Sequence, residues 1–304
     1  MIRCERVIYV KKTYTNPICK NAADPFVLLY NDKYYLYATN ASDGFKVLES
    51  DDLINWTDKG YCLKKGDTIG ESGFWAPEVI FYNDKFYMVY TADKHIAIAV
   101  SDSPLGPFKQ DEKRWIVEGR AIDGSLFVDE GEIYLYYNQL DYKYCIAGVK
   151  MNEDMKSVDE KSKKELLFPG ELEWEKIEGA VIEGPCVLEH KGKYYLTYSA
   201  NDYRSINYAV GYAVSNLPLG EFKKYEDNPI LHKSDAVYGT GHHSFTTSKD
   251  GKTLICVYHC HNNADEVHPR NACVDVAEFV SSDDGSDDVL RIIGPTSNAT
   301  PAID

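Results

Sequence analysis

Apolar and polar positions alternate along this chain with a period of two residues, and five stretches combine this alternation with a central polar turn. In each stretch, an apolar segment precedes the turn and a segment of alternating aromatic residues follows it. The turns contain Asn-Asp, Glu-Gly, Lys-Gly or Asp-Gly, which supply the positive φ angles of short hairpin loops. We therefore predict five β-hairpins, at residues 26–37, 79–90, 125–136, 186–198 and 245–258.

The hairpins recur at a nearly constant interval. Equivalent second-strand positions are 52, 47, 61 and 59 residues apart, at Tyr34, Phe86, Ile133, Tyr194 and Thr253. A third strand is expected after each hairpin, at residues 45–50, 96–101, 144–151, 208–215 and 272–279. A repeat of about 40–60 residues with several strands per unit is typical of propeller blades. We predict an all-β fold, a single five-bladed β-propeller spanning residues 1–304.

Four other segments stand out from the repeat. Similar phrases follow two of the third strands, Ser-Asp-Ser-Pro-Leu-Gly-Pro-Phe at 101–108 and Ser-Asn-Leu-Pro-Leu-Gly-Glu-Phe at 215–222, 114 residues apart, which is about two blades. The charged segment 152–167 fits either a short helix or an excursion between blades. The acidic run 281–288 is interpreted as a solvated loop.

Composition narrows the class of protein. Lys and Arg number 33 against 48 Asp and Glu, and the net charge of −15 disfavours a nucleic-acid or anionic-membrane surface. No apolar run is long enough to span a bilayer, and residues 1–6 lack the features of a signal peptide. Eight dispersed cysteines without a CxxC pair indicate reduced core thiols and a cytoplasmic location. Whether the chain forms a homo-oligomer is left open.

The candidate chemistry lies immediately before the hairpins. The inner strands of a propeller converge on its axis, and the residues at this phase of the five repeats are Asp24, Glu78, Asp123, Glu183 and His242. Clustering acids around one axis costs desolvation and repulsion, and it should drive their pKa values apart. Carboxyl groups held in different protonation states are what glycoside hydrolysis requires.

The phrases around these residues resemble those of glycoside hydrolase family 43, the β-xylosidase and α-L-arabinofuranosidase group of five-bladed propellers. The resemblance extends over nearly the whole chain and rests on Ala23-Asp24-Pro25, Trp75-Ala76-Pro77-Glu78, Ile122-Asp123-Gly124, Glu183-Gly184-Pro185 and Gly239-Thr240-Gly241-His242. It implies that Asp24 is the general base, Glu183 the general acid, and Asp123 the residue that orients the acid and raises its pKa. Inversion would require the base and acid carboxyls to lie about 6.5–9.5 Å apart.

The resemblance also implies binding residues. Arg270 corresponds to a ligand of sugar hydroxyls, Trp75 to a wall of the sugar subsite, and His242 to a contact of an axial metal ion, expected to be calcium or another cation; no organic cofactor is expected. Each has a structural alternative: Trp75 could be core, and His243, His259 or His261 could take the place of His242. Glu78 fits a structural role and a substrate contact equally well.

The substrate is less sharply defined. We predict an exo-acting enzyme that releases xylose or arabinose from short xylo- or arabino-oligosaccharides, with an endo-arabinanase as the main alternative. A retaining fructosidase of the same architecture is disfavoured, because Asn21-Ala22-Ala23-Asp24-Pro25 lacks the Trp-x-Asn-Asp-Pro phrase of that group. A non-catalytic sugar-binding propeller is disfavoured because it would bury acids without using them.

Overall fold

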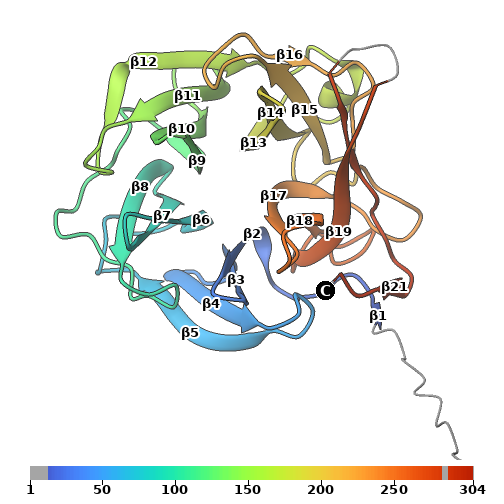
Figure 1. Cartoon of the computed structure of the whole chain (residues 1–304), viewed down its shortest axis with the longest axis horizontal. Helices are drawn as coiled ribbons and strands as arrows, with labels where there is room; N and C mark the ends of the chain where they lie inside the picture. Colours follow the sequence, from blue (N-terminus) through green and yellow to red (C-terminus); the bar gives the residue numbers. More distant parts are fainter. Residues whose placement is uncertain (1–12, 283–286, 304) are drawn as a thin grey trace, which may run out of the picture.

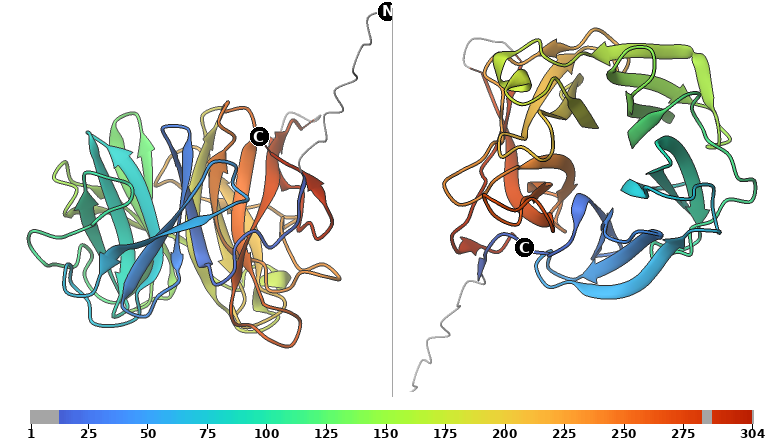
Figure 2. Two further views of the ribbon diagram at one scale, coloured as in Figure 1. Left: turned by 90° about the horizontal axis from the view of Figure 1, so that it is seen from below. Right: turned by 180° about the vertical axis from the view of Figure 1, so that it is seen from behind.

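Five β-sheets surround a central axis in the computed structural model, which describes residues 13–282 and 287–303 (Figure 1). In each sheet the strands follow one another in sequence order, antiparallel to their neighbours, from the axis outwards. The strands run along the direction of the axis, as the side view in Figure 2 shows. The prediction of a five-bladed β-propeller is therefore confirmed.

The blades are contiguous in sequence. Blade 1 contains β2 (Ala23–Tyr30), β3 (Lys33–Thr39), β4 (Gly44–Ser50) and β5 (Thr57–Lys64), and blade 2 contains β6 (Trp75–Tyr82), β7 (Lys85–Ala92) and β8 (His95–Ser101). Blade 3 contains β9 (Ala121–Asp129), β10 (Glu132–Gln139), β11 (Cys145–Met151) and β12 (Val158–Leu167). Blade 4 contains β13 (Ile182–His190), β14 (Lys193–Ala200), β15 (Ala209–Ser215) and β16 (Lys223–Lys224). Blade 5 contains β17 (Gly241–Thr247), β18 (Leu254–Cys260), β19 (Asn271–Val280) and β20 (Val289–Ile292).

The five predicted hairpins and third strands are all present. Four of the hairpin turns place two residues at positive φ, as the sequence predicted: Asn31-Asp32, Asn83-Asp84, Glu130-Gly131 and Lys191-Gly192. The segment 152–167 is neither a helix nor an excursion, because most of it forms β12, the outer strand of blade 3. A short 3₁₀ helix, η1 (Glu173–Lys176), lies instead between blades 3 and 4.

In both of its copies, the Pro-Leu-Gly phrase accepts a hydrogen bond from a buried tyrosine. The Tyr37 hydroxyl of blade 1 donates to the Pro104 carbonyl that follows blade 2, at 2.6 Å. The Tyr136 hydroxyl of blade 3 donates to the Pro218 carbonyl that follows blade 4, at 2.7 Å. Each phrase thus satisfies a buried tyrosine of the preceding blade, which lets an aromatic core residue keep its polar group inside.

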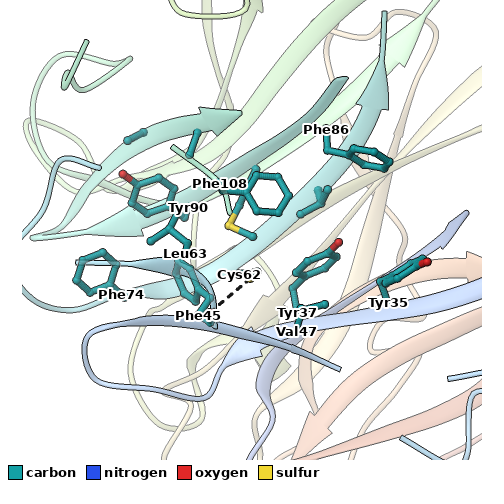
Figure 3. Close-up of a cluster of buried hydrophobic side chains, with 14 of the residues drawn as sticks. Tyr35, Tyr37, Phe45, Val47, Cys62, Leu63, Phe74, Phe86, Tyr90 and Phe108 are labelled. Carbon is teal, nitrogen blue, oxygen red and sulfur yellow. Dashed lines mark hydrogen bonds between the residues drawn. The ribbon is translucent and has the colours of Figure 1, made fainter. Parts of the chain in front are cut away.

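The hydrophobic core is divided among the spaces between blades. The cluster between blades 1 and 2 is built of aromatic rings packed at steep angles, among them Tyr37, Phe45, Tyr90 and Phe108 (Figure 3). The Phe45 ring lies 5.9 Å from both Phe74 and Tyr90, in edge-to-face geometry. Burial of such rings is the main stabilising contribution at each blade interface.

In the described part of the chain, the first and last blades share no strand, but the segment before blade 1 forms an isolated antiparallel bridge to blade 5, between Cys19 and Ala272. Strand β1 (Thr13–Tyr14) pairs with β21 (Thr300–Pro301) outside the ring, next to blade 5 and blade 1 (Figures 1 and 2). The Asn16 side chain forms two hydrogen bonds with Val274 of β19: it donates to the carbonyl and accepts from the N–H, at 2.9 Å each. Among the described residues, no helix is long and apolar enough to cross a membrane. The seven described cysteines are free thiols, six of them buried.

Candidate active site

The innermost strand of every blade carries a β-bulge at its axial end. In blade 1, Asp24 and Pro25 together face the single residue between Tyr37 and Thr39 of the neighbouring strand. In each of the other blades, two residues of the innermost strand likewise face one residue of the second strand. The first bulge residue always has a left-handed backbone, with φ of 51°, 46°, 58°, 56° and 46° at Asp24, Ala76, Asp123, Gly184 and His242. Left-handed conformations at non-glycine residues cost about 1–2 kcal/mol, so four of these five positions store strain at the axis.

The bulges correct the predicted alignment of the site residues. Asp24, Asp123 and His242 do occupy equivalent positions. Glu183, however, precedes the bulge residue Gly184 by one position, and Glu78 follows the bulge residue Ala76 by two. The prediction that all five residues share one phase was therefore wrong for Glu78 and Glu183. Glu78 belongs to the next layer along the axis, with Phe26, Ser125, Cys186 and Ser244.

A polar residue at the end of each second strand supports the bulge of the following blade. These side chains accept the backbone N–H of the bulge residue in four cases: Thr39 for Ala76, Thr91 for Asp123, Ser199 for His242 and His259 for Asp24. In blade 3 the equivalent residue is Asn138, whose Oδ1 has no partner among the described residues. The Gly184 N–H donates instead to Oδ2 of Asp123 at 3.3 Å. The bulge beside Glu183 is therefore held by Asp123.

Asp24 lies in a buried, positively charged environment. Its Oδ1 accepts from Nη1 of Arg270 at 2.7 Å, and its Oδ2 accepts from the Thr39 hydroxyl at 2.7 Å. Ring nitrogens of His242 and His259 lie 3.4 and 3.3 Å from Oδ1. Burial would raise the pKa of Asp24, but Arg270 and the two imidazoles outweigh it and hold that pKa well below its ordinary range. Asp24 is thus a carboxylate at neutral pH.

Asp123 and Glu183 form a coupled acidic pair with the opposite preference. Burial, followed by the charge of Glu183, raises the pKa of Asp123 well above its ordinary range. Burial also raises the pKa of Glu183 to about 7, assisted by the negative charge of Asp24 and opposed by a hydrogen bond from Tyr208. Burial is thus the first cause of the raised pKa of Glu183. The like-charge repulsion between Asp123 and Glu183 that the sequence predicted acts on both groups, so the two carboxyls titrate together. The pair retains protons near neutral pH.

Arg270, predicted as a ligand of sugar hydroxyls, lies beside Asp24, the predicted base. Its guanidinium group also stacks over the Tyr203 ring at 4.7 Å, and its Nη1 lies 3.4 Å from Nε2 of His259. Its Nε is buried and has no hydrogen-bond partner among the described residues. An arginine with one free buried donor is equipped to bind a further acceptor, such as a sugar hydroxyl.

Glu78 lies deeper along the axis, where no cationic side chain among the described residues lowers its pKa. Its carboxyl accepts from the Ser125 hydroxyl at 3.1 Å and from the Leu126 N–H at 3.0 Å. Burial raises its pKa to about 8 in spite of these two bonds. These contacts with blade 3 favour a structural role for Glu78 over contact with substrate.

A small axial pocket of about 20 Å³ is lined by Glu78, Ser125, His242 and His243, among others. His242 already faces Asp24, whereas Nδ1 of His243 is buried and without a partner among the described residues. Because the Thr197 hydroxyl donates to the Cys186 carbonyl, Nε2 of His243 must donate to Thr197, which leaves a lone pair on Nδ1. The described residues contain no group of three or more metal-ligating side chains. The pocket fits one small cation or water, with His243 as its nitrogen donor.

Trp75 is partly exposed, at 37% of its surface, and lies directly before the bulge of blade 2. It is therefore available for contact with a ligand rather than confined to the core. Tyr208 is a site residue that the sequence analysis did not name, and His259, which it named only as an alternative to His242 for the metal contact, contacts Asp24 instead. The Tyr208 hydroxyl donates to Oε1 of Glu183 at 2.8 Å, and His259 contacts both the backbone and the carboxylate of Asp24.

Comparisons with known proteins identify the family of this chain. The model of the family "Glycosyl hydrolases family 43" matches residues 14–286. The structure of a thermostable family-43 glycoside hydrolase superposes with a TM-score of 0.86 at 40% identity, covering 96% of this chain and 99% of that one. An endo-1,4-β-xylanase from Bacteroides thetaiotaomicron gives a TM-score of 0.86 at 37% identity, covering 95% and 99%.

A relative with a stated linkage is the extracellular exo-α-(1→5)-L-arabinofuranosidase of Streptomyces avermitilis, 28% identical over 279 residues. The match covers 83% of this chain and 57% of that protein, so the chain spans little more than half of its length. A five-bladed propeller with ionised and protonated carboxyls around one axial site defines the protein as a glycoside hydrolase. The family match over almost the entire described chain then places it in glycoside hydrolase family 43.

Proposed function

We propose that this protein is an exo-acting, inverting glycosidase that releases D-xylose, L-arabinose or both from short oligosaccharides. The observation that carries the proposal is the contrast between two buried carboxyls of one site: Asp24 is paired with Arg270, which lowers its pKa, whereas Glu183 receives the neutral Tyr208 hydroxyl and burial raises its pKa. An inverting glycosidase needs one carboxylate to activate water and one carboxylic acid to protonate the leaving oxygen. The two environments supply these two forms at the same pH.

In the proposed mechanism, Glu183 transfers its proton to the glycosidic oxygen while Asp24 removes a proton from a water molecule on the opposite face of the sugar. The water oxygen forms a bond to the anomeric carbon as the bond to the leaving oxygen breaks. The charge of Arg270 keeps Asp24 ionised before the reaction. Asp123 holds the Gly184 peptide and, through it, the backbone next to Glu183.

The names of the relatives support pentose-containing substrates. An exo-arabinofuranosidase and an endo-1,4-β-xylanase are both similar to this chain, and a β-xylosidase from Bacillus subtilis is 25% identical over 239 residues. β-D-xylopyranose and α-L-arabinofuranose can present similar hydroxyl patterns, which is why we propose both activities. Endo-action on xylan is the second candidate, because the structure of the Bacteroides thetaiotaomicron endo-1,4-β-xylanase is matched along 99% of its length.

We also propose a cation, with calcium as the first candidate, in the axial pocket. The free lone pair on Nδ1 of His243 supports this position, and His243 rather than His242 would be its protein ligand. A bound cation would supply positive charge on the axis below the catalytic carboxyls. Neither of the proton transfers assigned to Asp24 and Glu183 requires it.

The proposal is tested by proton NMR of the sugar freshly released from xylobiose and from an arabinofuranosyl-xylo-oligosaccharide, with and without EDTA. Because the reducing end of xylobiose contributes both anomers at their equilibrium ratio, an early excess of α-xylose over that ratio would establish xylosidase action with inversion. An early excess of β-xylose would overturn the inverting mechanism. Release of arabinose alone would restrict the activity to arabinofuranosides. Internal cleavage of longer xylan chains without monosaccharide would replace the exo-assignment by endo-action. Activity lost with EDTA and restored by calcium would support the axial cation.

A further inference from the structure

Tyr208 connects the two halves of the proposed catalytic site. It ends the loop between β14 and β15, and its side chain is fully buried. Its hydroxyl donates to Oε1 of Glu183 at 2.8 Å. Its ring stacks on His259 at a centroid distance of 5.6 Å and an angle of 13°. His259 in turn lies 3.2 Å from the backbone nitrogen of Asp24 and 3.3 Å from its Oδ1.

The Gly-x-Gly phrase before His242 makes room for this arrangement. A Cβ atom on Gly241 would lie 2.3 Å from Cε1 of Tyr208, a distance that no packed ring tolerates. A Cβ atom on Gly239 would lie 2.1 Å from Nε2 of His261, which packs beside Tyr203. The glycine at 241 therefore has a specific consequence, because it lets a tyrosine from the neighbouring blade reach Glu183.

We infer that Tyr208 is a positioning residue for Glu183. Its hydroxyl fixes the orientation of the acid, and its ring, which stacks on His259, fixes the position of the acid relative to Asp24. This inference rests on the proposed function, since it assumes that Glu183 is the acid. With Oε1 engaged by Tyr208, the transferable proton is carried on Oε2. Tyr208 is itself kept as an O–H donor, because burial and the charge of Glu183 raise its own pKa well above the ordinary value.

Tyr208 also sets the strength of the acid. A hydrogen bond donated to a carboxylate stabilises the ionised form, so it opposes the burial that raises the pKa of Glu183. Removing the hydroxyl in Tyr208→Phe should therefore raise this pKa. Hydrogen bonds to charged groups contribute about 1.5–3 kcal/mol, which corresponds to a shift of about one to two pH units.

The experiment measures kcat/KM against pH for wild type and Tyr208→Phe, with one substrate that has a poor leaving group and one activated aryl glycoside. We expect the alkaline limb for the poor leaving group to move about one to two units to higher pH. We also expect kcat at the optimum to fall about tenfold, with little change for the activated substrate, which needs less protonation. An unmoved alkaline limb would overturn the inference.

Tyr198→Phe is the matched control. Tyr198 is also a buried tyrosine of blade 4 whose hydroxyl donates to a buried glutamate, Glu175, at 2.6 Å. Its bond lies within the core cluster beside Trp174. The control should lower stability to a similar extent without moving the alkaline limb. A shift of equal size in both variants would assign the effect of Tyr208 to general destabilisation.

Gly241→Ala provides a second route if Tyr208→Phe does not fold. The added methyl group must displace the Tyr208 ring, so it should move the alkaline limb in the same direction. In a Tyr208→Ala background, where this ring is absent, the same change should have a much smaller effect on kcat/KM. Additive effects would contradict the coupling between Gly241 and Tyr208.

Glu183→Gln distinguishes failure of the proposed function from failure of the inference about Tyr208. Full activity of this variant on the poor leaving group would overturn the proposed function. Its inactivity combined with an unmoved limb in Tyr208→Phe would overturn only the inference about Tyr208.

Discussion

Asp24 and Glu78 are both buried carboxyls on the inner strands of one propeller, yet they have opposite charge states. Asp24 faces Arg270, His242 and His259, and its pKa is held well below its ordinary range. Glu78 receives only a hydroxyl and a backbone N–H, and burial raises its pKa to about 8. Burial alone neutralises a carboxyl, whereas a neighbouring guanidinium preserves its charge. The site is thus defined by the Arg270 guanidinium as much as by its acids.

The largest effect is expected from Asp24→Asn. The amide cannot accept a proton from water, so kcat should fall about 10²- to 10⁴-fold on every substrate. The change also leaves Arg270 without its charge partner, and breaking a buried pair costs about 3–5 kcal/mol of unfolding free energy. Steady-state kinetics and chemical denaturation measure the two effects separately.

Asp123→Asn is the control for that experiment. Because the raised pKa of Asp123 keeps it protonated, replacing it by an amide should destabilise the protein less than Asp24→Asn does. Equal destabilisation by the two changes would contradict the contrast between a charged and a neutral carboxyl. Retention of wild-type turnover by a folded Asp24→Asn variant would remove Asp24 from the role of base.

Glu183→Gln should have a selective effect. Substrates with a poor leaving group need a proton and should lose about 10²- to 10⁴-fold in kcat, whereas activated aryl glycosides should be affected far less. The alkaline limb of the wild-type profile, expected near the pKa of about 7, should disappear in this variant. Equal losses on both substrate types would contradict the assignment of Glu183 as the acid.

The smallest effect on turnover is expected from Glu78→Gln, because the amide resembles the neutral acid that it replaces. The effect should appear in stability against pH. The folded protein retains a proton on Glu78 between its ordinary value of 4.5 and about 8, whereas the unfolded chain has released it. The unfolding free energy of wild type therefore falls as pH rises through this window, by about 1.4 kcal/mol per unit from this group.

Denaturation with urea between pH 5.5 and 8, in buffer containing EDTA, should show a shallower decline for Glu78→Gln than for wild type. Glu221→Gln, a change at an exposed position, should retain the wild-type slope. A slope unchanged by Glu78→Gln would mean that Glu78 is ionised in the folded protein, and the comparison with Asp24 would then fail.

Much of this architecture could be predicted from local patterns. Two-residue alternation and turn residues such as Asn31-Asp32 are encoded within a dozen positions, so the hairpins and their repeat were visible in the sequence. The motif phrases likewise located Asp24, Asp123 and Glu183. The charged segment that became β12 was ambiguous because an outer strand exposed to solvent loses its apolar alternation.

The layering of the site was only partly visible in the sequence. Counted back from the first residue of the hairpin turn, Asp24 and Asp123 lie seven positions away, Glu183 eight and Glu78 five, so the sequence itself separates Glu78 from Asp24. The bulges do not cause this difference, because every blade has one at the same place. Tyr208 and His259 reach the acid and the base from other strands and loops, and no spacing rule connects them with Glu183. The clearest sequence signal was the glycine at 241, whose need for space is evident only beside the Tyr208 ring.

The five bulges share a left-handed first residue, although only two of them, at Asp24 and Asp123, present a carboxyl group. Ala76 adopts the same left-handed conformation as Asp24 and Asp123, and the Thr39 side chain supports its N–H in the same manner. The fold therefore presents equivalent bulge positions around the axis, at which the backbone conformation is the same and the side chain is free to vary. New chemistry could be introduced at Ala76 by a single replacement, without rebuilding the blade that carries it.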